Sequence, residues 1–122
     1  MEARIRRGEH FCVISYEGDT TGLMPGPLPE VLQALNEGTR EIILEFSGLK
    51  YLNPNGIKAL RDTLEAAKVR DANIGIAAPP AHVRRALRIG GLVPAIPIYH
   101  SEREAISKLD MVDYRDEAAV ES

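Results

Sequence analysis

Hydrophobic residues along the chain recur at two alternating periods, one typical of strands and one typical of helices. Residues 3–7 alternate Ile5 with charged neighbours, which predicts a short edge strand. After a turn at Gly8, residues 11–16 form a nearly continuous apolar run, typical of a strand buried on both faces. Residues 17–27 contain three glycines and two prolines and are predicted to be a loop.

Two amphipathic helices follow, separated by a predicted strand at residues 42–44. The first has apolar residues at the spacing i, i+3, i+4, i+7 and ends at Gly38: Leu28, Val31, Leu32 and Leu35. The second begins at Asn53, which suits a helix cap, and Pro54 suits the first helical position because its missing N–H is not needed there. Its predicted buried stripe is Ile57, Leu60, Leu64 and Ala67, and its predicted solvent side is Lys58, Arg61, Asp62 and Glu65.

The remaining residues continue the alternation. A strand is predicted at residues 73–78, and a helix opens at Pro79-Pro80 and ends at Gly90-Gly91. That helix is predicted to bury Val83 and Leu87 and to leave Arg84, Arg85 and Arg88 largely outside. Residues 96–98 are predicted to be a short strand that Pro97 places at a sheet edge, before a last helix with an inner face of Ala105, Ile106 and Leu109.

The order of these elements, β-β-α-β-α-β-α-β-α, predicts an α/β fold. We expect a single domain with a mostly parallel central sheet of four to five strands and helices packed against it. A chain of 122 residues has the length of one such domain. Residues 110–122 are acidic and lack clear periodicity, so we expect a loosely ordered acidic tail after a domain at residues 1–109.

Composition and charge argue against nucleic-acid binding, membrane insertion, secretion and an internal disulfide. The 15 Lys and Arg residues against 18 Asp and Glu give a net charge of −3, which argues against nucleic-acid binding. The apolar runs are far shorter than a membrane span, and the first residues lack the apolar stretch of a signal peptide. The single cysteine, Cys12, rules out an internal disulfide and fits a reducing compartment. We therefore expect a cytoplasmic protein without direct membrane insertion.

No set of residues predicts catalysis, a metal or a cofactor. The three histidines, His10, His82 and His100, fall on different elements without the spacing of metal ligands. Cys12 lies in the most apolar strand with no basic neighbour, as expected of a core residue. No phosphate-binding loop, paired carboxylates or nucleophile with its base stands out. We expect no enzymatic activity.

Four stretches, in the right order over residues 3–109, resemble the STAS domain of the anti-sigma factor antagonists. Asp19, in Tyr16-Glu17-Gly18-Asp19, is similar to the acidic residue of the family's Gly-Glu-Leu-Asp loop. Residues 42–48 resemble its central strand and Ser-Gly turn, and residues 52–57 correspond in sequence to its Met-Asp-Ser-Ser-Gly-Leu element. Residues 83–87 and then Gly91-Leu92 resemble its helix and closing Gly-Leu. The resemblance implies the STAS fold.

The chain departs from the family pattern where that pattern carries a switch. Asn53 replaces the family's aspartate, Pro54 replaces a serine, and Asn55 replaces the serine or threonine that partner kinases phosphorylate. A phosphate there would lie among free N–H groups at the positive end of a helix and add a charge of about −1.5 to −2. Asn55 has no hydroxyl, so this phosphorylation position is lost. Its neutral amide resembles the dephosphorylated, partner-competent form.

The resemblance implies a non-enzymatic regulatory module that binds an anti-sigma factor or a related partner-switching kinase or phosphatase. The residues expected to contact that partner are Asp19, Asn53, Asn55, Gly56, Lys58 and Arg61. The alternative is a structural STAS subunit of a larger assembly, either a stressosome-like scaffold or the accessory subunit of a lipid-transporting ABC complex. A homodimer is compatible with either function.

Simpler interpretations of the same residues remain open. Asn53 and Asn55 can serve only to satisfy backbone groups at a helix start, because caps are common. Asp19 can serve only to stabilise a turn. The arginines of the third predicted helix can form nothing more than a solvated face.

Overall fold

The computed structural model describes residues 1–109, and the expected tail at 110–122 lies outside the described residues. The strands are β1 (Glu2–Arg7), β2 (Cys12–Asp19), β3 (Glu41–Tyr51), β4 (Asn73–Ala77) and β5 (Ile98–Tyr99). The helices are α1 (Pro29–Asn36), α2 (Pro54–Val69) and α3 (Ala81–Ile89), and residues 102–109 are also helical. This order confirms the alternation that the hydrophobic pattern predicts.

The five strands form one sheet in the order β1-β2-β3-β4-β5. β1 pairs with β2 in the antiparallel direction, and the other three pairings are parallel. The edge positions predicted for the first and last strands are therefore confirmed. The mostly parallel sheet explains why the central strands read as apolar runs, since such strands are covered on both faces.

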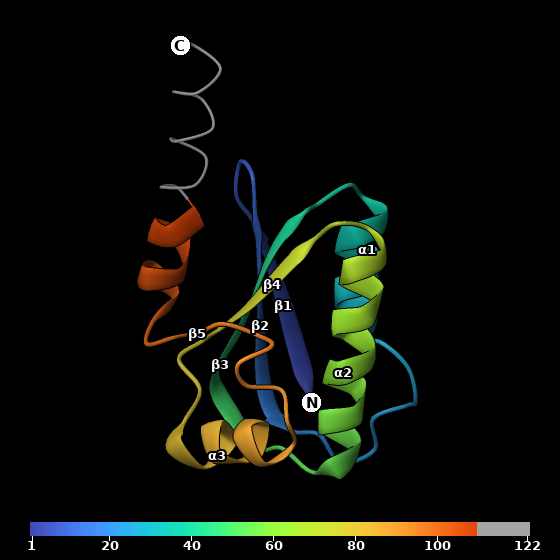
Figure 1. Cartoon of the computed structure of the whole chain (residues 1–122), viewed down its shortest axis with the longest axis vertical. Coiled ribbons are helices and arrows are strands. Elements are labelled where there is room, and N and C mark those ends of the chain that lie inside the picture. Colours follow the sequence, from blue (N-terminus) through green and yellow to red (C-terminus); the bar gives the residue numbers. More distant parts are fainter. Residues whose placement is uncertain (110–122) are drawn as a thin grey trace.

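Helices cover the two faces of the sheet unequally (Figure 1). Helices α1 and α2 lie on one face, where alternate residues of the strands supply the larger core, including Ile14, Tyr16 and Leu44. The other face carries a smaller apolar cluster of Val13, Ile43, Ala77 and Ala105, so residues 102–109 cover part of it. The period-2 alternation of a strand assigns neighbouring residues to these two cores.

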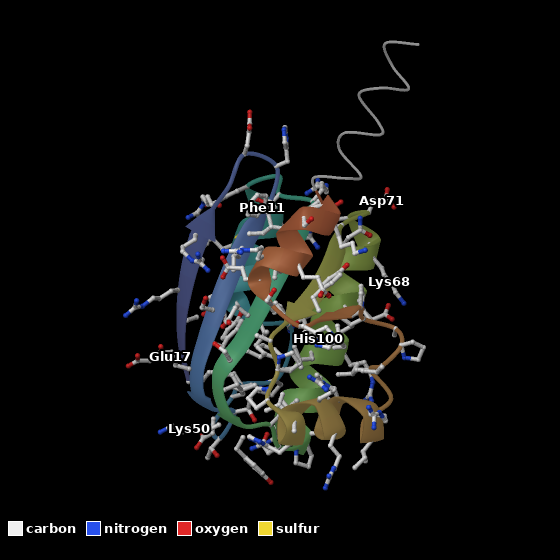
Figure 2. The ribbon with its side chains drawn as sticks, turned by 90° about the vertical axis from the view of Figure 1, so that its left-hand side faces the viewer. Phe11, Glu17, Lys50, Lys68, Asp71 and His100 are labelled. Carbon is white, nitrogen blue, oxygen red and sulfur yellow. The ribbon has the colours of Figure 1, made fainter. Side chains whose placement is uncertain are left out.

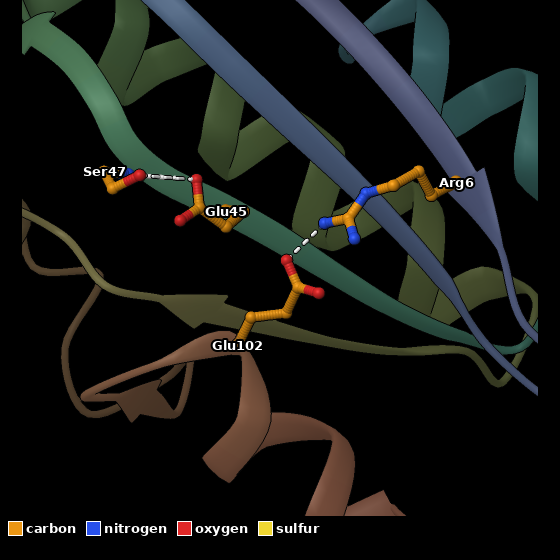
Figure 3. A network of polar contacts seen from close by, with 4 residues as sticks. All are labelled: Arg6, Glu45, Ser47 and Glu102. Carbon is orange, nitrogen blue, oxygen red and sulfur yellow. Dashed lines mark hydrogen bonds and ion pairs between the residues drawn. The ribbon is translucent and has the colours of Figure 1, made fainter.

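Polar side chains lie beside that apolar cluster, and four of them appear in Figure 3: Arg6, Glu45, Ser47 and Glu102. Arg6 of β1 forms an ion pair with Glu102, which joins the edge strand to the start of the helical residues 102–109. Nearby, the Ser47 hydroxyl donates to Oε1 of Glu45 at 3.0 Å. The last helix is thus held by apolar contacts and by one exposed ion pair.

Two predicted loop or turn segments are strand in the structure. The sequence predicts a loop from residue 17, but β2 continues to Asp19, and Ser47-Gly48 lies within β3 and not in a turn. The reason is the register, in which Ser15 pairs with Glu45, Glu17 with Gly48, and Asp19 with Tyr51. β3 thus has an additional residue at two places, and such bulges extend pairing while they bend the strand.

The last strand also differs from its prediction. The sequence places it at residues 96–98, whereas β5 comprises Ile98–Tyr99. Ile96 is instead buried in the larger core, and the carbonyl of Pro97 accepts from the N–H of Ile76 at 2.9 Å. A proline can still supply a carbonyl to a neighbouring strand, so its position here matches the constraint that it cannot donate.

Helix α2 is rotated relative to the predicted buried stripe. Leu60 and Ala67 are buried as predicted, but Ile57 and Leu64 are only half-buried. The face against the core also includes Gly56, Ala59 and Thr63. The Thr63 hydroxyl accepts from the N–H of Leu28 at 2.9 Å and donates to the Ala59 carbonyl at 2.7 Å. A hydrophobic pattern counts this buried threonine as polar and therefore misplaces the stripe.

Helix α3 buries Val83 and Leu87, as predicted, and exposes Arg85 and Arg88. Arg84 is half-buried, which the sequence did not predict, and within the described residues its Nε has no hydrogen-bond partner. None of the helices within residues 1–109 combines the length and hydropathy that a membrane-spanning segment needs.

Candidate functional site

The candidate site lies where β2 and β3 end and α2 begins. Because β2 and β3 are parallel, their last residues meet at one edge of the sheet, and Asp19 pairs with Tyr51 there. This carboxyl edge is the place where open α/β sheets most often bind ligands. In Figure 2, Lys50 marks this end of the molecule, while Lys68 and Asp71 lie at the far end of α2.

Asn53 caps α2. Its backbone is extended, with φ −88° and ψ 174°, and its Oδ1 accepts from the N–H of Gly56 at 2.9 Å. Pro54 takes the first helical position, so the helix starts where the sequence predicts. A cap of this kind typically stabilises a helix by about 1 kcal/mol. The structure therefore gives Asn53 an intramolecular function, whatever its contribution to docking.

Thr20 completes the cap, and the sequence did not identify it. Its hydroxyl accepts from the N–H of Asn53 at 2.9 Å and donates to Oδ1 of Asn53 at 2.8 Å. The side chain is almost fully buried, at 3% exposure. These two bonds fix the end of β2 against the start of α2. The only signal for it in the sequence is a threonine after Asp19, which any polar loop could contain.

Gly56 is buried beneath the helix start. A Cβ at this position would lie 2.6 Å from Cδ1 of Leu52 and 2.7 Å from Oγ1 of Thr20. Because the Thr20 side chain is itself held in place by Asn53, a larger residue would require the helix start to move. The apolar space between this helix start and the core is only about 10 Å³, at the lower limit for one water. A partner at this site would therefore meet the outer surface.

Three predicted site residues face solvent at this edge. Asp19, Asn55 and Lys58 are exposed, and Asn55 is the second residue of α2. Oδ1 of Asp19 accepts from the N–H of Thr21 at 3.0 Å, so the turn interpretation of Asp19 has a structural basis. Tyr51, beside Asp19, is 55% exposed and adds an aromatic surface that the sequence did not single out.

Arg61 connects α2 to α3. Its Nη2 donates to the carbonyl of Gly90 at 2.6 Å, at the end of α3. Helix α3 is also joined to β3, because Nε2 of His82 forms a hydrogen bond with the carbonyl of Lys50 at 2.6 Å. The bond to Gly90 occupies the guanidinium of Arg61 within the molecule. The structure thus brings Asp19, Asn53, Asn55 and Gly56 together and places Arg61 at the neighbouring α2–α3 contact.

The remaining reactive groups lie elsewhere in the described residues. Cys12 is buried in β2, and burial raises the pKa of its thiol. The hydroxyl of buried Tyr16 donates to Oε1 of Glu30 at 3.2 Å, and burial with the nearby Glu30 carboxylate raises the pKa of Tyr16. Within residues 1–109, no three His, Cys, Asp or Glu side chains come together as metal ligands would.

Comparison with known proteins identifies the fold. A family model described as STAS domain matches residues 27–105, whereas no curated protein matches the chain. A solved anti-sigma factor antagonist from Mycobacterium paratuberculosis is 18% identical, with a TM-score of 0.73 over 88% of this chain and 92% of that chain.

Two further solved structures share the fold. The anti-sigma factor antagonist SpoIIAA in its unphosphorylated form is 17% identical, with a TM-score of 0.67 over 89% of this chain and 96% of its own. A chain of the stressosome, described as a signal integration and transduction hub, is 14% identical, with a TM-score of 0.68 over 90% of this chain and 98% of its own. The STAS family model covers well over half of this sequence, and the chain belongs to the STAS domain family.

Proposed function

We propose that this chain is a regulatory protein-binding module that docks on an anti-sigma factor or a related partner-switching kinase or phosphatase. Docking occurs through Asp19 and the first turns of α2, with Asn55 and Lys58 as direct contacts. Asn53 and Gly56 hold that surface in place, and Arg61 borders it. The module is cytoplasmic and non-enzymatic, needs no cofactor, and neither binds nucleic acid nor inserts into a membrane.

The observation that carries the proposal is the exposed, neutral side chain of Asn55 on a rigid helix start. Asn55 faces solvent, whereas the backbone on either side of it is held in place. Hydrogen bonds link Thr20, Asn53 and Gly56, and Gly56 packs closely against Leu52 and Thr20. A surface of fixed geometry binds with little loss of conformational entropy. A rigid outer edge with charged and aromatic neighbours thus supports recognition of another protein.

The charge at position 55 determines whether this surface is competent to bind its partner. Asn55 offers no hydroxyl, so a kinase cannot phosphorylate this position. In STAS relatives that are phosphorylated at the corresponding residue, the added negative charge separates the protein from its partner. The chain then remains in the partner-competent form, and its activity depends on its concentration and on that of its partner.

The test is calorimetric titration of the anti-sigma factor or partner-switching kinase encoded nearest to this chain. Asn55→Asp and Asn55→Glu should weaken binding more than Asn55→Ala, because only the acidic variants imitate a phosphorylated helix start. Their melting temperatures should not fall, since an acidic residue in the first turn interacts favourably with the helix dipole by about 0.3–1 kcal/mol.

Asn36→Asp is the matched control. Asn36 is also exposed, but it ends α1 and precedes β3, so it lies at the opposite edge of the sheet. It should leave the affinity unchanged. Equal affinities for the Asp, Glu and Ala variants at position 55 would remove this surface from the interface.

The second candidate function is that of a structural STAS subunit, and the likeness to a stressosome chain favours it. In that function the chain would assemble with copies of itself or with other STAS subunits, and position 55 would not control binding. Sedimentation velocity of the purified chain, alone and with STAS proteins encoded nearby, separates the two functions. A large, stable assembly that is indifferent to Asn55→Asp would favour the structural subunit.

A further inference from the structure

The pair Asn55-Gly56 is chemically unusual within this chain. The sequence has four asparagines, and only Asn55 is followed by glycine; Asn36, Asn53 and Asn73 precede Glu37, Pro54 and Ile74. The backbone nitrogen after an asparagine can attack the side-chain amide carbon, and glycine hinders that attack least because it has no side chain. Packing also fixes the glycine, since a Cβ at Gly56 would collide with Leu52 and Thr20.

We propose that Asn55 is a site of spontaneous deamidation that acts as a one-way charge switch on the docking surface, and that the Asn53 cap controls its rate. The nitrogen of Gly56 bonds to Cγ of Asn55, the bond from Cγ to the amide nitrogen breaks, and the proton from Gly56 leaves with that nitrogen as ammonia. Water then opens the resulting succinimide ring at one of its two carbonyls. The products are aspartate or isoaspartate, and the only other reactant is solvent water.

The structure holds this reaction back in the native state. The N–H of Gly56 donates to Oδ1 of Asn53 at 2.9 Å, so the attacking nitrogen is already engaged. Gly56 is buried, and its backbone is part of the helix. Ring closure needs a backbone that departs from the helix at this residue. The reaction therefore proceeds from molecules in which the start of α2 has opened.

Deamidation changes the charge or the backbone at position 55, where the proposed docking would be most sensitive. Aspartate at position 55 places a carboxylate on the exposed helix start, where the helix dipole tolerates it. Isoaspartate adds a methylene group to the backbone and disrupts the cap. This regulatory consequence rests on the proposed function, whereas the modification itself does not. Deamidation would convert a partner-competent chain into a released one without a kinase.

The rate of modification is measured by peptide mass spectrometry on the full chain after incubation at mildly alkaline pH. Wild type should gain deamidation at Asn55 and not at Asn36 or Asn73. Asn53→Ala should raise the rate at Asn55 roughly five-fold, the change expected if loss of a typical cap increases the open population by the same factor. Asn55→Gln keeps a side-chain amide, but its side chain is one carbon longer and cannot close the succinimide ring. This variant should show no modification at position 55.

A comparison with Leu60→Ala separates local opening from global unfolding. Leu60→Ala lowers the stability of the whole domain without removing a hydrogen bond of the cap, so its rate should rise less than that of Asn53→Ala. Equal rates in wild type and Asn53→Ala, or a larger increase in Leu60→Ala than in Asn53→Ala, would overturn the inference.

The functional arm uses protein aged in this way, with the deamidated fraction separated by anion exchange. That fraction and Asn55→Asp should both bind the anti-sigma factor or kinase more weakly than the unmodified protein. Deamidation at the expected rates with unchanged affinity would refute the proposed docking surface and leave the modification standing. Absence of deamidation from both wild type and Asn53→Ala would refute the inference and leave the proposed function intact.

Discussion

At the scale of single residues, the start of α2 divides its polar side chains into two groups. Thr20 and Asn53 satisfy each other and the N–H of Gly56, and Thr20 is almost entirely removed from solvent. Asn55 lies two residues after the cap and is exposed. The internal pair fixes the geometry of the helix start, and Asn55 remains exposed to solvent.

Thr20→Val should destabilise the domain by about 1–3 kcal/mol, although the side chain keeps its shape. The reason is that the N–H of half-buried Asn53 loses its acceptor. Urea unfolding followed by circular dichroism measures the loss. Thr21→Val is the control, because exposed Thr21 should change stability by no more than about 0.5 kcal/mol. Equal unfolding midpoints for the two variants would show that the Thr20–Asn53 contact contributes nothing.

The sequence predicts one half of this cap, Asn53, but carries no recognisable signal for the other, Thr20. Asn53 before Pro54 is a local signal, because both residues act within the same turn of helix. Thr20 acts across 33 residues, through the pairing of β2 with β3. No local pattern encodes that contact, so only the folded chain shows it.

At the scale of elements, the hydrophobic pattern located each helix within residues 1–109 but did not give the orientation of α2. The pattern predicted Ile57 and Leu64 as buried, whereas the core side of the helix also carries Gly56 and Thr63. Close approach at Gly56 and the two hydrogen bonds of Thr63 turn the helix toward small residues. Tertiary contacts thus overrode a pattern that counts only apolar side chains.

Leu60→Ala should cost about 2–5 kcal/mol, because Leu60 is 3% exposed and leaves a cavity under α2. Leu64→Ala removes the same atoms from a half-buried position and should cost clearly less. Guanidinium unfolding of both variants gives the comparison within one helix. A larger loss at Leu64 than at Leu60 would place the predicted stripe, and not the observed one, against the sheet.

At the scale of the whole molecule, the parallel sheet gathers the site at one edge. The alternation of strands and helices was enough to predict this α/β layout, since each strand and helix has its own period. The bulged register of β2 against β3 was not predictable, because the additional residues of β3 leave no signature in a hydrophobic pattern. That register places Tyr51 beside Asp19 and so extends the candidate surface beyond the residues that the sequence named.

The absence of a hydroxyl at Asn55 predicts how the chain responds to a kinase. Incubation with a STAS-directed kinase and ATP should place no phosphate on α2 of the wild type, whereas Asn55→Ser should restore an acceptor. Thr63 is fully buried, so it should remain unmodified in the folded protein. Phosphopeptide mapping decides the outcome. Stoichiometric phosphate on exposed Ser47 of the wild type would show that the switch has moved to the other face of the sheet.

We propose that a protein partner docks on the edge formed by the end of β2 and the start of α2. Backbone amide chemical shifts of the isotope-labelled chain, recorded with and without the unlabelled anti-sigma factor or kinase, test it most directly. We expect the largest changes at Asp19, Tyr51, Asn55 and Lys58, with little change in residues 102–109. Changes concentrated on residues 102–109 or on the edge strands β1 and β5, with Asn55 unaffected, would contradict it.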